Sequence, residues 1–409
     1  MGTLHPLGAI NLILQHARNA PFYRDRLPST SVQSWEEFKR LPFLTKDDLR
    51  RQSPEGLVCV PRRQILQYHE TSATTGSPVS VWYSGDDLEE IRNLLADWGV
   101  GFNGEDRVLI KFPYALSSIA HFVQAAAQHQ RACVIAADSR TTSTPLPVVV
   151  ELMRRLQVTV LATLSLQTVM VAEAAEMAGL VPRRDFPHLR AICCAGEPLT
   201  PHRRQLVQEI WGVPVYDNYG MTETGPQAMD CPERGLHPFQ GHFWMEVLDD
   251  RLEEEVAPGE TGNLVVTSLT RRATPMIRYL TGDRVRLLRQ PCACGQTTTL
   301  QIRGRANDTL WAQGKPFDFW ELQAIVSQLP SRRFWRAAAG PEGLRFVVER
   351  ERDGDQIQPE LLERLRQLHG VRLWVDLVPK GTLYDRGEPV SFGMSGKPVY
   401  IHASHDAVQ

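Results

Sequence analysis

Strand-like and helix-like segments alternate between about residue 88 and residue 200, and this alternation constrains the fold more than any other feature of the sequence. Short apolar runs rich in β-branched or small residues predict strands at 107–112, 132–137, 158–163 and 189–198, the last running into a loop. Apolar residues at helical spacing predict helices at 88–98, 121–128, 148–156 and 169–178. Strands separated by helices of this length are typical of crossover units, so we predict an α/β fold with a mostly parallel sheet.

The pattern changes after this alternating region. Beyond Gly225, short β segments separated by turns predict an antiparallel β-subdomain. A polar, turn-like break at Arg305 and Asn307 then leads into a tail with two helical segments. We therefore predict a large N-terminal domain, residues 1–304, and a small, mobile α+β domain, residues 305–409.

Composition narrows the class of protein. The chain has 409 residues, 42% hydrophobic and 22% charged, the balance of a globular protein with a sizeable core. Its formal net charge of -2 gives no bulk reason to expect nucleic acid as a partner. No apolar run approaches the ~20 residues that cross a bilayer, so we expect no membrane association. The odd number of seven cysteines, without a secretory signal, predicts reduced thiols in the cytoplasm.

The stretch V-Y-D-N-Y-G-M-T-E-T-G, residues 215–225, falls at a predicted strand end. Ligands of parallel sheets bind beyond the carboxyl ends of the strands. We interpret the stretch as a polar turn in which Tyr219 offers a flat face to a base and Gly220 lets the backbone approach closely. In the same turn Thr222 supplies a hydroxyl group, and Glu223 supplies a carboxylate suited to a hard cation.

A run of hydroxyl side chains, T-S-A-T-T-G-S-P at 71–78, lies between two strand-like segments. Such a loop can present hydroxyl and backbone N–H groups to phosphate oxygens. It lacks the G-x-x-x-x-G-K-[ST] spacing of a Walker P-loop, and a solvated hairpin loop is the alternative interpretation. Two further candidates follow later: Asp283 in the loop L-T-G-D, whose carboxylate can accept ribose hydroxyl protons, and Lys397 in a Ser-Gly loop.

Three cysteines and one histidine occur as two close pairs on separate loops. Cys231 and His237 lie in D-C-P-E-R-G-L-H, and Cys292 and Cys294 lie in P-C-A-C-G. Three thiolates and one imidazole match a closed, structural Cys₃His zinc site. Three free thiols beside an unrelated histidine are the alternative, but exposed unliganded cysteines crowded near turns are a liability, so the pattern favours zinc.

The motifs T-S-A-T-T-G-S-P, Y-D-N-Y-G-M-T-E, T-G-D with G-R-A-N-D, and S-G-K occur in an order that resembles the acyl-adenylate-forming superfamily. Within it the chain is similar to the phenylacetate–CoA ligase branch, with which it also shares A-G-E-P, G-L-H and C-x-C-G. The resemblance covers nearly the whole chain. It implies an enzyme that activates a carboxylic acid with ATP and Mg²⁺ and passes the acyl group to a thiol, with coenzyme A the expected acceptor.

The resemblance also implies a role for each matching residue. The hydroxyl-rich loop would hold the β- and γ-phosphates of ATP through Thr71, Ser72, Thr74, Thr75 and Gly76. The adenine would stack on Tyr219 and lie beside the strand-end residues Ala195, Gly196, Glu197 and Pro198. Thr222 would contact the α-phosphate, Glu223 would hold Mg²⁺, and the ribose would bind Asp283 and Arg305. Lys397 would bridge the acyl carboxylate and the α-phosphate, a task that suits a compact charge on a flexible stem.

An aromatic acid is the expected substrate. Phe112, Tyr114 and His121 follow a predicted strand end, where the family has its acyl pocket. Packing within a strand–helix unit is the alternative role for these three residues.

Four residues depart from the family's pattern. Ala73 stands where glycine is usual, Ser77 where lysine is usual, Leu280 where arginine is usual, and Asn307 at the expected hinge aspartate. A methyl group in the phosphate loop and the missing lysine would weaken triphosphate binding. These departures leave open a nucleotide-binding homologue without turnover. The resemblance itself leaves open two other reactions: transfer to a carrier protein or amine, as in antibiotic biosynthesis, and nucleotidylation of a cofactor hydroxyl. A homodimer also stays open.

Overall fold

A seven-stranded sheet forms the centre of the computed structural model, which describes residues 6–71, 77–139, 141–384 and 400–402. In spatial order its strands are β4 (Cys133–Ala136), β3 (Arg107–Ile110), β5 (Val160–Thr163), β6 (Ala191–Ala195), β7 (Val215–Met221), β8 (Gly225–Asp230) and β9 (Leu236–Pro238). The strands from β4 to β7 run parallel, whereas β8 and β9 are antiparallel additions at one edge. The predicted α/β fold with a mostly parallel sheet is confirmed.

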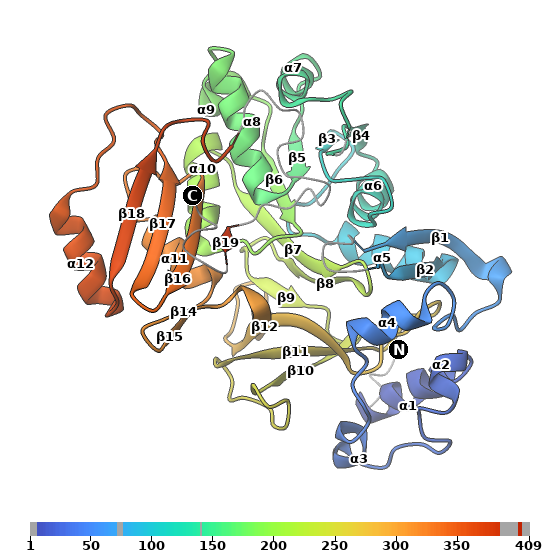
Figure 1. Cartoon of the computed structure of the whole chain (residues 1–409). Coiled ribbons are helices and arrows are strands. Elements are labelled where there is room, and N and C mark those ends of the chain that lie inside the picture. Colours follow the sequence, from blue (N-terminus) through green and yellow to red (C-terminus); the bar gives the residue numbers. More distant parts are fainter. Residues whose placement is uncertain (1–5, 72–76, 140, 385–399, 403–409) are drawn as a thin grey trace.

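Helices cover both faces of this sheet (Figure 1). They are α5 (Gly85–Ala96), α6 (Ile119–His129), α7 (Leu146–Arg155), α8 (Ser165–Met177), α9 (Pro182–Asp185) and α10 (Pro201–Trp211). Ile192 and Cys194 of β6 pack with residues of α7, α8 and α10, whereas Ala191 and Cys193 pack with residues of α6. Neighbouring residues of this central strand therefore enter two different cores, as expected for a strand buried on both faces.

The first part of the chain adds small helices and a hairpin on one side of the sheet (Figure 1). Its elements are α1 (Pro6–Ala17), α2 (Pro21–Arg24), α3 (Trp35–Lys39), α4 (Lys46–Gln52), the 3₁₀ turn η1 (Arg62–Gln64), β1 (Ile65–Glu70) and β2 (Ser80–Ser84). Strands β1 and β2 pair antiparallel on either side of the hydroxyl-rich segment. Hence the described ends of that segment are fixed by a hairpin.

A four-stranded antiparallel sheet follows, as predicted for the β-subdomain. It consists of β10 (Phe243–Leu248), β11 (Thr261–Ser268), β12 (Tyr279–Arg289) and β13 (Thr298–Arg305). Two local predictions are wrong, one in β7 and one in β12. Residues 215–221 continue as strand, so only Thr222 to Thr224 form a turn before β8, and L-T-G-D lies inside β12 instead of in a separate loop.

A bulge in β12 explains the second error. Asn263 pairs with Arg284 and Val265 pairs with Leu280, so Thr281 to Asp283 face Leu264 alone. Gly282 has a φ of 78°, which glycine adopts without strain. A bulge of this kind interrupts the alternation of a strand and re-aims a side chain, in this case that of Asp283.

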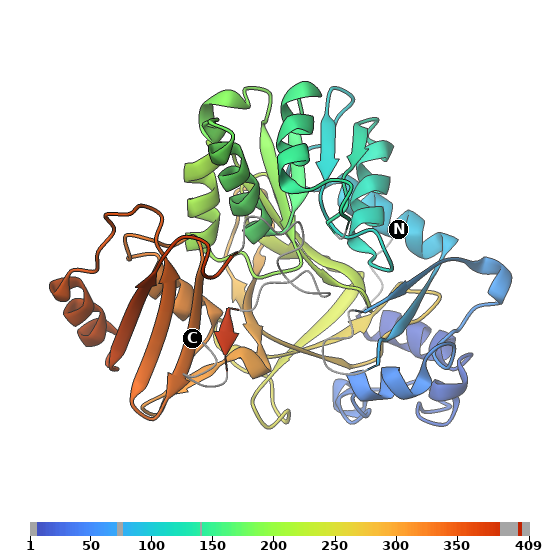
Figure 2. The ribbon, with the colours of Figure 1, turned by 45° about the horizontal axis from the view of Figure 1, so that its top comes forward.

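The elements after Arg305 form sheets of their own. They are η2 (Ala306–Asp308), β14 (Leu310–Ala312), β15 (Lys315–Phe317), α11 (Phe319–Val326), β16 (Trp335–Gly340), β17 (Gly343–Glu349), α12 (Pro359–His369), β18 (Leu373–Val378) and β19 (Ile401–His402). Strands β18, β17, β16 and β19 make a mixed sheet whose core includes Leu322, Trp335 and Phe346. In Figure 2 this part stands beside the rest of the chain, in orange and red. The boundary at residue 304 stays a prediction.

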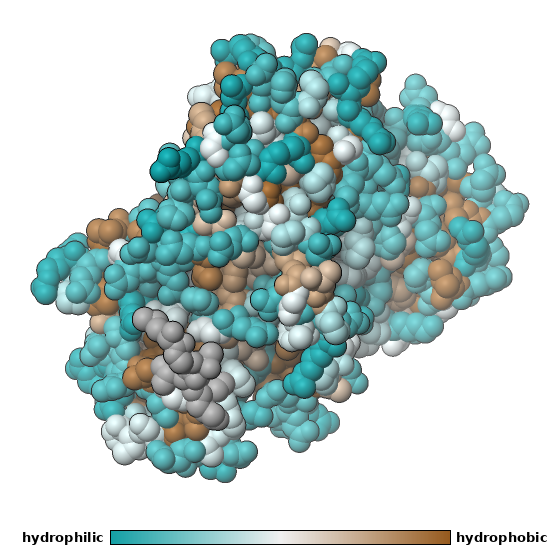
Figure 3. All heavy atoms as spheres, turned by 180° about the vertical axis from the view of Figure 1, so that it is seen from behind, coloured by the Kyte–Doolittle hydropathy of each residue, from teal (hydrophilic) through white to brown (hydrophobic). Residues whose placement is uncertain are grey.

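Within the described ranges, no helix is both long and apolar enough to cross a membrane. Seen from behind, the surface is mostly hydrophilic, and its hydrophobic residues form separate spots (Figure 3).

Candidate active site

A cavity of about 390 Å³ lies beyond the carboxyl ends of the parallel strands, between this sheet, β12, β13 and α4. Most of the described residues that the sequence analysis selected line it: Thr71, Phe112, Ala195, Gly196, Glu197, Pro198, Tyr219, Gly220, Thr222, Glu223, Asp283 and Arg305. Six separate segments of the sequence therefore meet at one site.

Tyr219, Asp283 and Arg305 form a connected polar group in this cavity. The Tyr219 hydroxyl donates to Asp283 Oδ2 at 2.7 Å, and Arg305 Nε lies 3.7 Å from Asp283 Oδ1. Burial and the Asp283 carboxylate both raise the pKa of Tyr219, so its hydroxyl stays protonated and keeps donating. This bond fixes the ring of Tyr219 beside the cavity, with the carboxylate of Asp283 held between two partners.

Glu223 lies in the short turn between β7 and β8 and is 4% exposed. The Tyr279 hydroxyl donates to Glu223 Oε1 at 3.1 Å, and Lys46 Nζ lies 3.5 Å from the same oxygen. A largely buried carboxylate with one cationic partner is a suitable ligand for a hard cation.

Glu197 is held at the start of α8. Its Oε1 accepts hydrogen bonds from Ser165 Oγ at 2.7 Å and from the backbone N–H of Leu166 at 2.6 Å. A carboxylate at the N-terminus of a helix meets unsatisfied N–H groups and the positive end of the helix dipole. Glu197 therefore fixes the loop that carries Gly196 and Pro198 to the cavity.

Several residues that line the cavity have no role predicted from the sequence, among them Lys46, Asp217 and Tyr400. Asp217 belongs to the selected stretch 215–225, but neither its burial nor its neighbour Asp230 is visible in the local sequence. Burial and the Asp230 carboxylate raise the pKa of Asp217 well above its usual range. Lys46 lies in L-P-F-L-T-K-D-D-L-R, a segment that the resemblance also covers, but only tertiary packing brings it to the cavity, and the same holds for Tyr400.

Of the three residues predicted to form an acyl pocket, Phe112, Tyr114 and His121, only Phe112 lines the cavity. Phe112 lines the cavity together with Ile119 and Phe122, which adds an apolar wall. Tyr114 and His121 are not among the lining residues. Instead, the Tyr114 hydroxyl lies 3.0 Å from the side-chain oxygen of Gln124, and His121 Nε2 lies 3.0 Å from the carbonyl oxygen of Tyr114.

Some selected residues lie outside the described ranges: Ser72, Ala73, Thr74, Thr75, Gly76 and Lys397. The residues next to the hydroxyl-rich segment are described. Thr71 Oγ1 accepts a hydrogen bond from the N–H of Val79 at 3.0 Å, and the carbonyl of Ser77 accepts one from Arg50 Nε at 3.3 Å.

The predicted cysteine–histidine group comes together between the two sheets. The ligand atoms of Cys231, His237, Cys292 and Cys294 all lie within 4.8 Å of one another. His237 Nδ1 lies 2.6 Å from the carbonyl oxygen of Thr298. Because a carbonyl can only accept, Nδ1 carries the proton, which leaves Nε2 free to bind a metal.

Two further features of this group suit a metal. The N–H of Cys294 and the side chain of His237 lower the pKa of Cys292 to about 7, which favours the thiolate. A Cβ atom on Gly235 would lie 3.0 Å from His237 Nε2 and 3.5 Å from Cys292 Sγ, so a larger residue at this position would crowd the ligands. The four side chains fit a tetrahedral ion of the zinc type.

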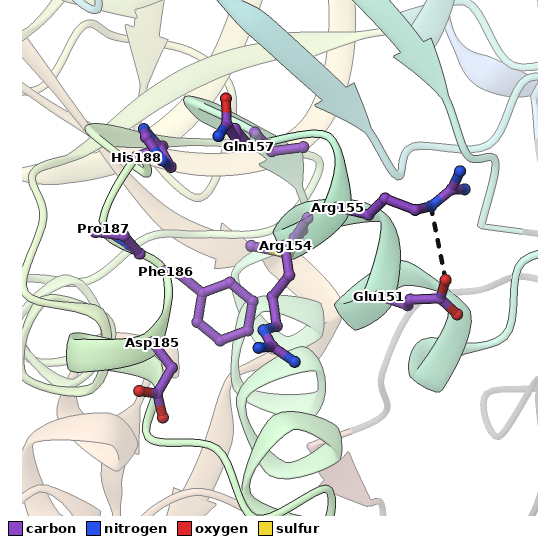
Figure 4. Close-up of a pocket in the computed structure, with 10 residues that line it drawn as sticks. Glu151, Arg154, Arg155, Gln157, Asp185, Phe186, Pro187 and His188 are labelled. Atoms are coloured by element: carbon purple, nitrogen blue, oxygen red, sulfur yellow. Dashed lines mark ion pairs between the residues drawn. The ribbon is translucent and has the colours of Figure 1, made fainter.

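A second hollow, of about 400 Å³, lies near the amino ends of β5 and β6. Both acidic and basic side chains line it. Arg155 Nε lies 3.6 Å from Glu151 Oε1, and Arg154 lies near Asp185 and Phe186 (Figure 4). None of the residues selected from the sequence motifs lines it.

Fold and cavity together define an enzyme of the acyl-adenylate-forming class. The chain belongs to the family of AMP-binding enzymes, whose model matches residues 22–270. It is therefore an acid–thiol ligase that activates a carboxylic acid with ATP.

Curated relatives named Phenylacetate-coenzyme A ligase are similar over most of the chain. The protein from Pseudomonas putida is 30% identical over 322 residues, which are 76% of this chain and 72% of that one. The one from Escherichia coli (strain K12) is 29% identical over 318 residues, 74% of this chain and 70% of its own.

Solved structures of 2-hydroxyisobutyryl-CoA ligase also match. One in the postadenylation state, in complex with R3-HIB-AMP, is 25% identical with a TM-score of 0.85, and the match covers 98% of this chain and 89% of that one. One with 2-HIB-AMP and CoA in the thioesterification state is 26% identical with a TM-score of 0.69, covering 97% and 88%. The present structure thus superposes better on the postadenylation state.

Proposed function

We propose that this enzyme activates an aromatic carboxylic acid with ATP and transfers the acyl group to coenzyme A. The observation that carries the proposal is the cavity at the carboxyl ends of the parallel strands, where Tyr219, Glu223 and Asp283 meet. The apolar wall of Phe112, Ile119 and Phe122 supports an aromatic acid, because it offers no charged partner to the acyl part. The similarity to ligases of phenylacetate supports the same acid class and acceptor.

In this proposal Tyr219 and the strand-end residues 195–198 bind the adenine, and Asp283 with Arg305 binds the ribose. Thr222 contacts the α-phosphate, and Glu223 holds Mg²⁺. The ion supplies positive charge to the phosphates, which lowers the cost of forming pyrophosphate. The hydroxyl-rich residues Thr71, Ser72, Thr74, Thr75 and Gly76 contact the β- and γ-phosphates.

The first chemical step is an in-line displacement. An oxygen of the acid's carboxylate attacks the α-phosphorus, and the bond to the bridging oxygen breaks with its electron pair leaving on pyrophosphate. The protein does little covalent chemistry in this step, so it catalyses the step by positioning the reactants and neutralising their charge. We assign Lys397 to bridge the acid and the α-phosphate. In the second step the thiol sulfur attacks the acyl carbon and its proton passes to solvent, while the bond from the acyl carbon to the phosphate oxygen breaks and AMP leaves with the electron pair.

We further propose that residues 305–409 form a domain that moves between the two steps. Lys397 has to approach the α-phosphate during adenylation and then leave, because the thiol needs access to the same acyl carbon. The better superposition on a postadenylation state supports assigning the present arrangement to the adenylation side of the cycle.

The cysteine–histidine group is proposed to bind one structural zinc ion. Cys231 and His237 come from the end of the seven-stranded sheet, and Cys292 and Cys294 come from the turn between β12 and β13. A closed site of four protein ligands leaves no position for a substrate, so the ion would connect the two sheets without taking part in the reaction.

The proposal is tested by incubating the protein with Mg²⁺-ATP, coenzyme A and a panel of acids that includes phenylacetate, benzoate, 2-hydroxyisobutyrate and hexanoate. Mass spectrometry of the products should find AMP and acyl-CoA with the aryl acids. AMP without acyl-CoA would reject coenzyme A and favour a carrier protein or amine as acceptor. Turnover restricted to the alkyl acids would reject the aromatic substrate.

A further inference from the structure

Serine hydroxyls line the cavity in the part that the proposed nucleotide contacts do not use. Ser117 and Ser118 end the loop between β3 and α6, and Ser139 follows β4. In the sheet, β3 is two places from β6 and three from β7, which is about 10 and 14 Å at the usual spacing of strands. The ends of β3 and β4 therefore lie away from the proposed adenine contacts, in the part of the cavity left for the acid.

Ser118 has a buried hydroxyl group that does not serve its own helix. The residue is 5% exposed and lines the cavity. It is the N-cap residue of α6, where a serine side chain usually accepts a hydrogen bond from a backbone N–H of the first turn. Among the described residues, its side chain makes no such capping bond. A buried hydroxyl group needs a partner, so this one is available to a ligand in the cavity.

Apolar side chains surround this hydroxyl group. Phe122 follows Ser118 by four residues, so both lie on the same face of α6, and the N–H of Phe122 donates to the carbonyl of Ser118 at 3.1 Å. Phe112, Ile119 and Phe122 line the same part of the cavity. A pocket with apolar walls and one well-placed polar group can bind a ring and fix its orientation.

A buried lysine fixes the segment that carries Ser139. Lys111 is 4% exposed, and its ammonium group donates to the carbonyl oxygens of Asp138 and Thr144, to the second at 2.6 Å. The N–H of Tyr114 donates to Asp138 Oδ1 at 3.2 Å. These bonds attach residues on both sides of Ser139 to the end of β3, so this polar wall of the cavity is held in place before a ligand binds.

Resting on the function proposed above, we infer that this part of the cavity binds a hydroxyl or amino substituent on the ring of the acid, with Ser118 as the contact residue. The described lining residues between 112 and 139 are all uncharged, which suits a neutral substituent. A serine hydroxyl can both donate and accept, so it can serve either group. The substituent lies on the side of the ring away from the carboxylate, because the carboxylate has to reach the α-phosphate.

The test measures kcat/KM for acid-dependent release of pyrophosphate with phenylacetate and its 3- and 4-hydroxy, amino and methyl derivatives. A methyl group is close to a hydroxyl group in size but makes no hydrogen bond, so it separates the effect of shape from that of hydrogen bonding. The wild type should prefer a hydroxy or amino acid to the matching methyl acid by about 10-fold or more.

Ser118→Ala should lower kcat/KM for the preferred acid by about 3- to 10-fold and leave phenylacetate and the methyl acids within about twofold of the wild type. Ser118→Thr retains the hydroxyl group and should retain most of the preference. Ser34→Ala is the matched control, because Ser34 is also an N-cap serine but caps its helix and does not line the cavity.

A wild type that uses the methyl acids as well as the hydroxy and amino acids would overturn the inference. Slowing of all acids by the same factor in Ser118→Ala, or of none, would also overturn it. A wild type that adenylates none of the acids would instead reject the proposed function. Calorimetric affinities of the same acids for the wild type and Ser118→Ala, measured with AMP present, would then decide whether Ser118 contacts the substituent.

Discussion

The residues before and after Arg305 contribute to the site in different ways. The earlier part supplies nearly all of the described cavity lining from strand ends and from β12, which are built on large apolar cores. The later part has its own core and contributes Asp308, Phe319, Tyr400 and Ile401 to the lining. The cavity is thus formed by the first part and closed by the second.

The contact between the two parts combines ion pairs with apolar packing, since Phe334 and Tyr384 lie in the core formed by α7, α8 and α10. Arg333 makes two hydrogen bonds to Glu176, at 2.8 and 2.9 Å, and lies 3.4 Å from Glu173. Arg332 lies 2.5 Å from Glu209. Ion pairs between two parts of a chain can separate and re-form. These pairs are therefore the part of the contact that fits the movement proposed for residues 305–409.

Lys397→Ala should have the largest effect, because it removes the proposed contribution of the later part to the first step. Loss of one contact made in the transition state costs about 3–4 kcal/mol, or about two to three powers of ten in the adenylation rate. Transfer from a supplied acyl-adenylate should proceed at a near-normal rate. Single-turnover measurements of the two steps check this, and equal slowing of both would argue against a moving lysine.

Asp283→Ala should have the next largest effect, and it acts on the earlier part alone. It removes the carboxylate that holds Tyr219 and the proposed ribose contact, so ATP affinity should fall about 10- to 100-fold. AMP affinity should fall by a similar factor, since both nucleotides have the ribose. Calorimetry measures both, and unchanged AMP affinity would reject the ribose site.

Cys292→Ser should lower stability without acting on the chemistry directly. Elemental analysis should find one zinc ion per wild-type chain and close to none in the variant, and the unfolding temperature should fall by several degrees. Cys133→Ser is the control, because Cys133 is exposed and lies in β4, outside the cysteine–histidine group. Wild-type protein that holds no metal would reject the zinc site.

Arg333→Ala should have the smallest effect. It should shift the equilibrium between the domain arrangement proposed for adenylation and the one proposed for thiol transfer. Removing a partly exposed pair costs about 1 kcal/mol, so adenylation should slow by a few fold and thiol transfer should not. Arg345→Ala is the control, because Arg345 pairs with Asp376 inside the later part. If both variants slow adenylation equally, the contact with Glu176 does not stabilise the arrangement.

The sequence predicts those features that depend on local pattern. Alternating strands and helices identify the parallel sheet, and the strand ends with the loops that follow them contain Glu197, Tyr219 and Glu223, because parallel strands end at one edge. The pattern does not predict that Asp283 lies in a bulge, since pairing with β11 decides the course of β12. The place of Lys46 in the cavity is not predicted for a similar reason, because it depends on backbone hydrogen bonds of Leu44 to residues more than 200 positions away.

Exchange of labelled pyrophosphate into ATP, measured without any thiol, tests most directly that this cavity forms an acyl-adenylate. Exchange should require Mg²⁺ and an aryl acid, and it should be lost in Glu223→Gln, in which the proposed metal ligand is neutral. If the wild type binds ATP and yet shows no acid-dependent exchange over the whole panel of acids, the chain binds nucleotide without adenylating acids.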